Sequence, residues 1–173
     1  EKYPETYDKA TPAELAYCGP HRLADPLPGS RLTVGQALLS PTRTYAPYVL
    51  RLLATLGVAK VRGMVHCSGG GQTKCRRFGT GVHFIKDTSS RPPPIFAEIA
   101  RVSGTEPEEM HKVYNMGHRL EVFLDPADVP AALALAAELG IAAQVVGRTE
   151  ASSRPDRANH VTVIKDGRTL AYA

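Results

Sequence analysis

Three consecutive glycines at positions 69–71 lie three residues beyond an apolar segment, residues 58–65. Because glycine has no Cβ atom, successive backbone N–H groups in such a run can turn toward one point and approach a ligand closely. Hydroxyl-bearing and cationic side chains flank the run: Ser68, Thr73, Lys74, Arg76 and Arg77. The segment therefore predicts a buried strand that ends in an anion-binding loop, with a ligand-free turn between two strands as the alternative.

The glycine run matches neither of two common nucleotide-binding motifs. A Walker A loop has a glycine directly before Lys-Ser or Lys-Thr, whereas Lys74 lies between Thr73 and Cys75. The dinucleotide fingerprint has spaced glycines rather than adjacent ones. The residues alone therefore predict backbone amides that hold a phosphate or carboxylate group, without naming the ligand.

Composition limits the classes of protein and partner. The 173 residues suit one domain, and their 43% hydrophobic and 22% charged content is ordinary for a globular protein. No apolar run approaches the roughly 18 residues that span a bilayer, and no secretory signal is present. We therefore expect a cytoplasmic protein without a membrane partner.

The charge and the aromatic content bear on nucleic-acid binding. A net charge of +4 favours an anionic small molecule, and 6% aromatics without tryptophan argue against a base-stacking platform. A non-catalytic module that binds RNA or another polyanion is the alternative, through the cations Lys60, Arg62, Lys74, Arg76 and Arg77.

The three cysteines, Cys18, Cys67 and Cys75, include no Cys-x-x-Cys pair. We therefore expect no metal site and reduced thiols. The alternative is a zinc site in which Cys67 and Cys75 join His66 and His83.

Residues 1–30 are predicted to form an extended arm or interdomain connector, and residues 31–173 a domain. The arm contains Pro4, Pro12, Pro20, Pro26 and Pro28, which rule out one helix or one central strand. We expect its tyrosines, Tyr3, Tyr7 and Tyr17, to dock on a neighbouring surface.

Helical spacing predicts helices at residues 47–56, 94–103 and 126–140. Gly57 is expected as a left-handed cap of the first, and a Thr105–Glu108 capping box is expected to begin another short helix through Val113. Strands are predicted at residues 58–65, 82–86, 120–124 and 144–148, with a terminal hairpin around Asp166-Gly167. This order predicts an α+β layered domain, in which helices cover a mixed sheet.

Several polar residues are candidates for ligand binding. His66 ends the strand before the glycines and could donate to an anion or polarise a carbonyl; a structural histidine is the alternative. Arg43, beside Thr42, carries a planar fork suited to phosphate, or it forms a surface ion pair. Asn115 lies in a predicted helix–strand turn and either binds a ligand or takes a left-handed conformation, and the turn is favoured.

Four ordered segments carry a family resemblance: LLSPTRTY at 38–45, RGMVHCSGGG at 62–71, PPIF at 93–96 and EMHKVYNMG at 109–117. They resemble the C-terminal half of aminoimidazole ribonucleotide (AIR) synthetase, or phosphoribosylformylglycinamidine cyclo-ligase. The resemblance implies an α/β/α layered domain with partly ferredoxin-like topology. It also implies ATP-dependent cyclisation of formylglycinamidine ribonucleotide in purine synthesis, by phosphorylation of an amide oxygen and attack by nitrogen.

The resemblance also implies roles for individual residues. His66 would be catalytic, and the segment that faces the cleft between two domains would comprise Ser68, Gly69, Gly70 and Gly71, with Thr42, Arg43 and Asn115 nearby. The chain departs from the family pattern at Ser68, where threonine is usual, and at residues 74–77, where an acidic-amide stretch is usual.

The family's N-terminal domain, which binds most of the ATP and Mg²⁺ and forms most of the homodimer interface, is expected to precede Glu1. We therefore expect the isolated chain to be inactive. The alternatives within the superfamily are formylglycinamidine ribonucleotide synthetase, selenophosphate synthetase, thiamine-phosphate kinase and a hydrogenase-maturation protein.

Overall fold

The computed structural model describes residues 12, 19–88 and 91–173. The α-helices are α1 (Val34–Leu38), α2 (Ala46–Leu56), α3 (Pro94–Ser103), α4 (Pro107–Val113) and α5 (Val129–Glu138). The strands are β1 (Val61–His66), β2 (Val82–Lys86), β3 (Leu120–Leu124), β4 (Gly147–Ala151), β5 (His160–Lys165) and β6 (Arg168–Tyr172). Short 3₁₀ helices are η3 (Val58–Lys60), η4 (Gly71–Arg77) and η5 (Pro126–Asp128).

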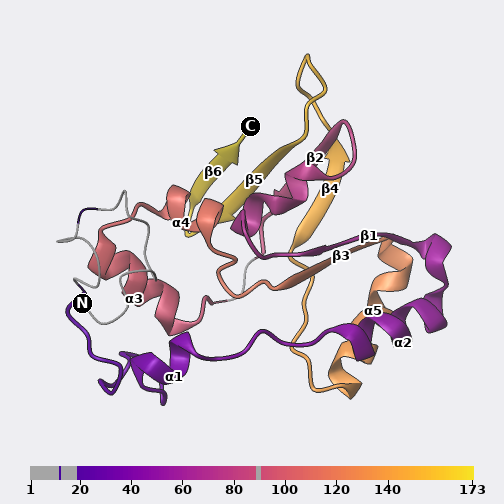
Figure 1. Ribbon diagram of the computed structural model, residues 1–173. Helices are drawn as coiled ribbons and strands as arrows, with labels where there is room; N and C mark the ends of the chain where they lie inside the picture. The colour runs from indigo at the N-terminus through magenta and orange to yellow at the C-terminus, as the bar shows by residue number, and fades with distance from the viewer. Residues whose placement is uncertain (1–11, 13–18, 89–90) are drawn as a thin grey trace.

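The fold class is α+β with a mixed sheet, as the sequence predicts. Strands are ordered β4-β2-β5-β6 in the larger sheet, where β2 and β5 are parallel and the other pairs antiparallel. The strands β1 and β3 form a separate antiparallel ribbon that runs between the larger sheet and the helices α2 and α5 (Figure 1). The prediction of one sheet is therefore corrected to two.

Alternation along the β1–β3 ribbon explains its place between two layers, because successive side chains point to opposite faces. One face, which includes Leu120 and Val122, packs against Leu52 and other apolar residues of α2 and α5. The opposite face, which includes Val65 and Phe123, packs against the larger sheet. The ribbon thus has an apolar partner on each side.

Several predicted elements are confirmed near their expected positions, including α2, α3, β2, β3 and the terminal hairpin. The hairpin turn places Asp166 at φ 50° and Gly167 at φ 74°, as a two-residue turn of this sequence requires. Gly57 has a positive φ of 83°, but its ψ of 148° is extended rather than left-handed helical. The left-handed cap expected there is therefore wrong.

Two further expectations are corrected. The capping box at Thr105 is absent: α4 begins at Pro107 after an extended Glu106, and the Thr105 hydroxyl instead bonds the Ser103 hydroxyl at 2.6 Å. Proline at the first helical position lacks one of the N–H groups that a helix start leaves unbonded, and its fixed φ suits the helix. The strand expected at residues 144–148 lies at β4 instead, where its pairing partner is β2.

Residues 19–30 fold back on the start of the domain. Leu27 is buried, and the N–H groups of Val34 and Gly35 donate to the carbonyls of Asp25 and Leu23 at 2.9 and 2.8 Å. The predicted docking tyrosines of the arm, and Cys18, lie outside the described residues. Across the ranges that are described, no helix combines the length and apolar character needed to cross a bilayer.

Candidate functional site

The glycine loop, residues 67–71, connects the end of β1 to η4. Cys67 extends the ribbon by one bond, since its N–H donates to the Arg119 carbonyl at 2.8 Å. The N–H of Gly71 donates to the Ser68 carbonyl at 3.0 Å, which closes a tight turn. Within the described part of the chain, the amides of Gly69 and Gly70 have no such acceptor. Of the three glycine amides, those two are therefore open to an anion.

The three loop glycines differ in their backbone conformation and in the space around them. Gly70 has φ 96° and Gly71 has φ 50°, both in the region that side chains disfavour. A Cβ atom at Gly71 would also lie 2.5 Å from the Tyr114 carbonyl oxygen, so the loop packs tightly on the end of α4. At Gly69 nothing lies within 4 Å of a Cβ position, and φ is ordinary. Of the three loop glycines, Gly69 is therefore the one whose Cβ position is open.

Cationic side chains border the open amides. Lys74 Nζ donates to Ser68 Oγ at 2.6 Å, across the mouth of the loop. The Arg77 guanidinium lies 3.7 Å from the position a Cβ would take on Gly70. A phosphate at the amides of Gly69 and Gly70 would therefore have an ammonium, a guanidinium and a hydroxyl close by.

His66 and the segment before α2 meet at the same end of β1. The rings of Tyr45 and His66 make an edge contact with centroids 6.3 Å apart. Thr42 and Arg43 lie on this segment and are exposed, and within the described residues neither side chain has a hydrogen-bond partner. The structure thus brings the Thr42–Tyr45 stretch toward His66 without fixing the arginine.

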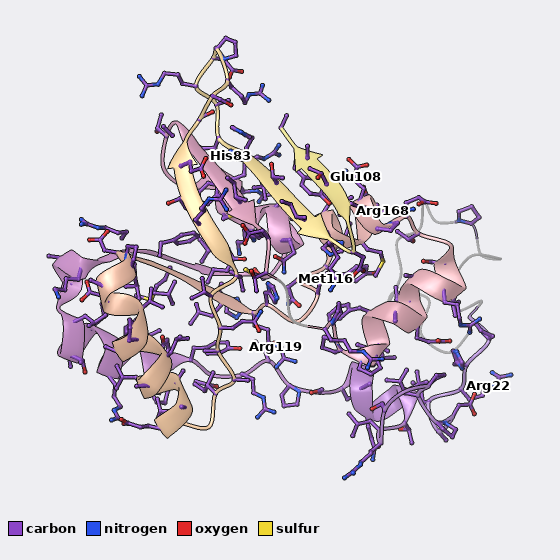
Figure 2. The ribbon with its side chains drawn as sticks, turned by 180° about the vertical axis from the view of Figure 1, so that it is seen from behind. Arg22, His83, Glu108, Met116, Arg119 and Arg168 are labelled. Atoms are coloured by element: carbon purple, nitrogen blue, oxygen red, sulfur yellow. The ribbon has the colours of Figure 1, made fainter. Side chains whose placement is uncertain are left out.

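Asn115 lies behind the loop and holds it. Its side-chain amide donates to the Cys67 carbonyl at 3.0 Å, and its Oδ1 accepts from the Gly117 N–H at 2.9 Å. The backbone carbonyl of Asn115 accepts from the Gln72 side chain. The left-handed conformation expected at Asn115 belongs instead to Met116, at φ 52°, which lies just before β3 (Figure 2).

A second asparagine, Asn159, fixes the far end of η4. Its side-chain nitrogen lies 3.0 Å from the carbonyls of Arg76, Phe78 and Gly79, and its Oδ1 accepts from the Val82 N–H at 2.9 Å. An asparagine just before a strand gives no signal of this role in the sequence.

The loop also lies on a buried charged group that sequence reasoning missed. Lys86 and Glu121 form an ion pair in which both side chains are almost fully buried, and Lys86 Nζ also donates to the Gln72 carbonyl at 2.6 Å. Lys86 is the last residue of β2 and precedes Asp87, and Glu121 lies between Leu120 and Val122, so both look like charges that a strand would place in solvent. Only tertiary structure brings the two strands together.

The zinc alternative does not assemble. His83 lies on β2 away from the glycine loop (Figure 2), with its ring stacked on His160 at a centroid distance of 3.9 Å. Cys67 and Cys75 are free, and burial raises the pKa of their thiols to about 12 and about 11. Among the residues with described positions, no group of three or more His, Cys, Asp or Glu could hold a metal ion.

A comparison with protein families decides the relationship. Residues 23–158 match the family described as AIR synthase related protein, C-terminal domain. The chain belongs to this family. The match covers the glycine loop, the Thr42–Tyr45 stretch and Asn115 alike.

Two similar proteins carry the name phosphoribosylformylglycinamidine cyclo-ligase. The chain is 36% identical to that of Methanocaldococcus jannaschii over 116 residues, or 67% of this chain and 33% of the relative. It is 35% identical to that of Lachnospira eligens over 125 residues, or 70% of this chain and 36% of the relative. The chain thus spans about a third of the length of the curated relatives it matches.

Proposed function

We propose that this chain is the C-terminal part of a phosphoribosylformylglycinamidine cyclo-ligase and that its glycine loop binds the phosphate of a phosphorylated ribonucleotide substrate. The observation that carries the proposal is the pair of open amides at Gly69 and Gly70, bordered by Lys74 and Ser68. Adjacent N–H groups that point to one concavity are a common anion site in proteins. The names of the relatives support the choice of substrate class.

His66 would act on the reacting end of the substrate. It is exposed at the end of β1, one residue before the loop, and Tyr45 contacts its ring. In the proposed reaction ATP transfers a phosphoryl group to the amide oxygen of the substrate. A nitrogen of the same substrate then attacks the amide carbon, and the oxygen leaves that carbon as phosphate. An imidazole at this place would donate a hydrogen bond to the departing oxygen.

ATP and Mg²⁺ are proposed to bind mainly to the remaining two thirds of the enzyme. The described residues supply no metal ligand set, so we assign no Mg²⁺ ligand to them. We therefore propose that the 173-residue chain binds the phosphate of the ribonucleotide but does not by itself cyclise the ribonucleotide. A steady ATP-dependent turnover by the purified chain would contradict this part of the proposal.

An NMR titration of the ¹⁵N-labelled chain tests the site. Formylglycinamidine ribonucleotide should shift the amide signals of Gly69 and Gly70 and saturate at one ligand per chain, whereas the matched nucleoside without phosphate should not. The variant Gly69→Val should keep its fold, because the Cβ position is open, yet lose the saturable shift. Equal binding by Gly69→Val and the unaltered chain would refute the proposal.

A further inference from the structure

The buried pair beneath the loop has no role in the proposed chemistry, yet Lys86 bonds Gln72, the residue that directly follows the loop. Lys86 is 5% and Glu121 6% exposed, and they come from different sheets: Lys86 ends β2, and Glu121 lies in β3. Desolvating two charges costs free energy that their attraction does not always recover. A pair of apolar side chains would fill the same space, so stability alone does not explain the charges.

The ammonium of Lys86 is fully used. It donates to the Gln72 carbonyl at 2.6 Å, to the Gln72 Oε1 at 3.1 Å and to a carboxylate oxygen of Glu121. Three donors meet three acceptors, so the ammonium has no proton or hydrogen bond to give a ligand. Two of the three bonds are made to a single residue, the one that directly follows the glycine run.

The pair reaches both ends of the loop. Gln72 directly follows Gly71, and its side chain donates to the backbone carbonyl of Asn115. The side chain of Asn115 in turn donates to the Cys67 carbonyl. Burial raises the pKa of the Cys67 thiol; the charge of Glu121 raises this pKa further and the charge of Lys86 lowers it, so both charges act on this residue. Cys67 and Gln72 are the two residues that flank Ser68–Gly71.

We propose that Lys86 and Glu121 are positioning residues for the glycine loop: their buried ion pair holds Gln72, and through it Asn115 and Cys67, so that the open amides of Gly69 and Gly70 keep the spacing that a phosphate needs. The identity of the ligand in this inference rests on the proposed function, whereas the effect of the ion pair on the loop does not. A substitution of the pair should loosen the loop even when no ligand is present.

The test uses the double variant Lys86→Met/Glu121→Leu, which removes both charges and leaves no buried charge unpaired. The Gly71 and Thr73 amides, whose bonds close the turn, should exchange hydrogen at least about tenfold faster, because a bond to a charged group typically contributes that factor or more. Binding of formylglycinamidine ribonucleotide should weaken by at least about tenfold for the same reason. The thermal unfolding should stay cooperative.

The matched control is Lys60→Met/Asp128→Leu. It removes an ion pair with the same change of net charge, between η3 and η5, at 2.7 Å. Exchange at Gly71 and Thr73 should be unchanged in this control. A folded Lys86→Met/Glu121→Leu variant with unaltered loop exchange overturns the inference.

A second variant covers failure of the first to fold. Gln72→Leu keeps the ion pair but removes the side chain that links Lys86 to Asn115, and it should accelerate loop exchange in the same way; normal exchange there also overturns the inference. If loop exchange accelerates but the unaltered chain binds no ribonucleotide at Gly69 and Gly70, the positioning role stands and the proposed function fails.

Discussion

The side-chain amide of Asn115 donates to the backbone carbonyl of Cys67 at 3.0 Å, across 48 residues of sequence. This one contact ties the segment before β3 to the residue where the glycine loop begins. Because the same side chain accepts from the Gly117 N–H, both of its polar atoms bond to the protein. Asn115 therefore holds the loop in place.

The variant Asn115→Ala should lower the free energy of unfolding by about 1–3 kcal/mol, since it leaves the half-buried Cys67 carbonyl and Gly117 N–H without their partner. Urea denaturation followed by circular dichroism measures the change. The control is Gln144→Ala, which removes an exposed amide 3.3 Å from the Thr88 carbonyl and should change stability by no more than about 0.5 kcal/mol. Equal losses in the two variants would contradict the assigned role.

Alanine should destabilise the protein at Gly71 but not at Gly69. Gly71→Ala should destabilise by about 2 kcal/mol or more, since φ is 50° and the added Cβ would lie 2.5 Å from a backbone oxygen. Gly69→Ala meets nothing within 4 Å and should be neutral within about 0.5 kcal/mol. Thermal unfolding of both variants is the measurement; a neutral Gly71→Ala would mean that the loop does not pack on α4 as described.

Acid should weaken the attachment of residues 19–30 to α3. Hydrogen bonds from Arg101 and His21 lower the pKa of Glu98 from 4.5 to about 2. The folded state therefore binds fewer protons than the unfolded state in this range, so the stabilisation is complete above about pH 4.5 and is lost as the pH falls toward 2. Denaturation at a series of pH values should show this decline.

The variant Glu98→Gln should remove that part of the pH dependence, because its side chain does not titrate. Glu138→Gln is the control: its carboxylate is exposed, pairs with Arg51 on the surface, and should leave the acid profile as it was. An unchanged profile in Glu98→Gln would show that another group governs acid stability.

The sequence correctly predicted elements whose formation depends on residues close together in the chain. The Asp166-Gly167 turn needs two positive φ values, which that dipeptide accepts readily, and the hairpin formed there as expected. The helix α3 ends at Gly104, in the left-handed conformation. The glycine run was likewise placed at the end of a strand.

What the sequence could not supply depends on contacts between distant segments. An apolar run at residues 144–148 reads as a strand by itself, but pairing with β2 moves the strand to Gly147–Ala151. Lys86 and Glu121 each look like solvent-facing charges until β2 and β3 are brought together. The three glycines look equivalent in the sequence, but in the structure a positive φ and close packing on the end of α4 distinguish Gly71 from Gly69.

The most direct test of the anion site is a crystal structure of the chain soaked with phosphate. The account predicts density for the ion within hydrogen-bond distance of the Gly69 and Gly70 nitrogens, with Lys74 or Arg77 beside it, and no such density in crystals of Gly69→Val. Phosphate bound elsewhere, with the Gly69 and Gly70 amides bonded to the protein itself, would contradict it.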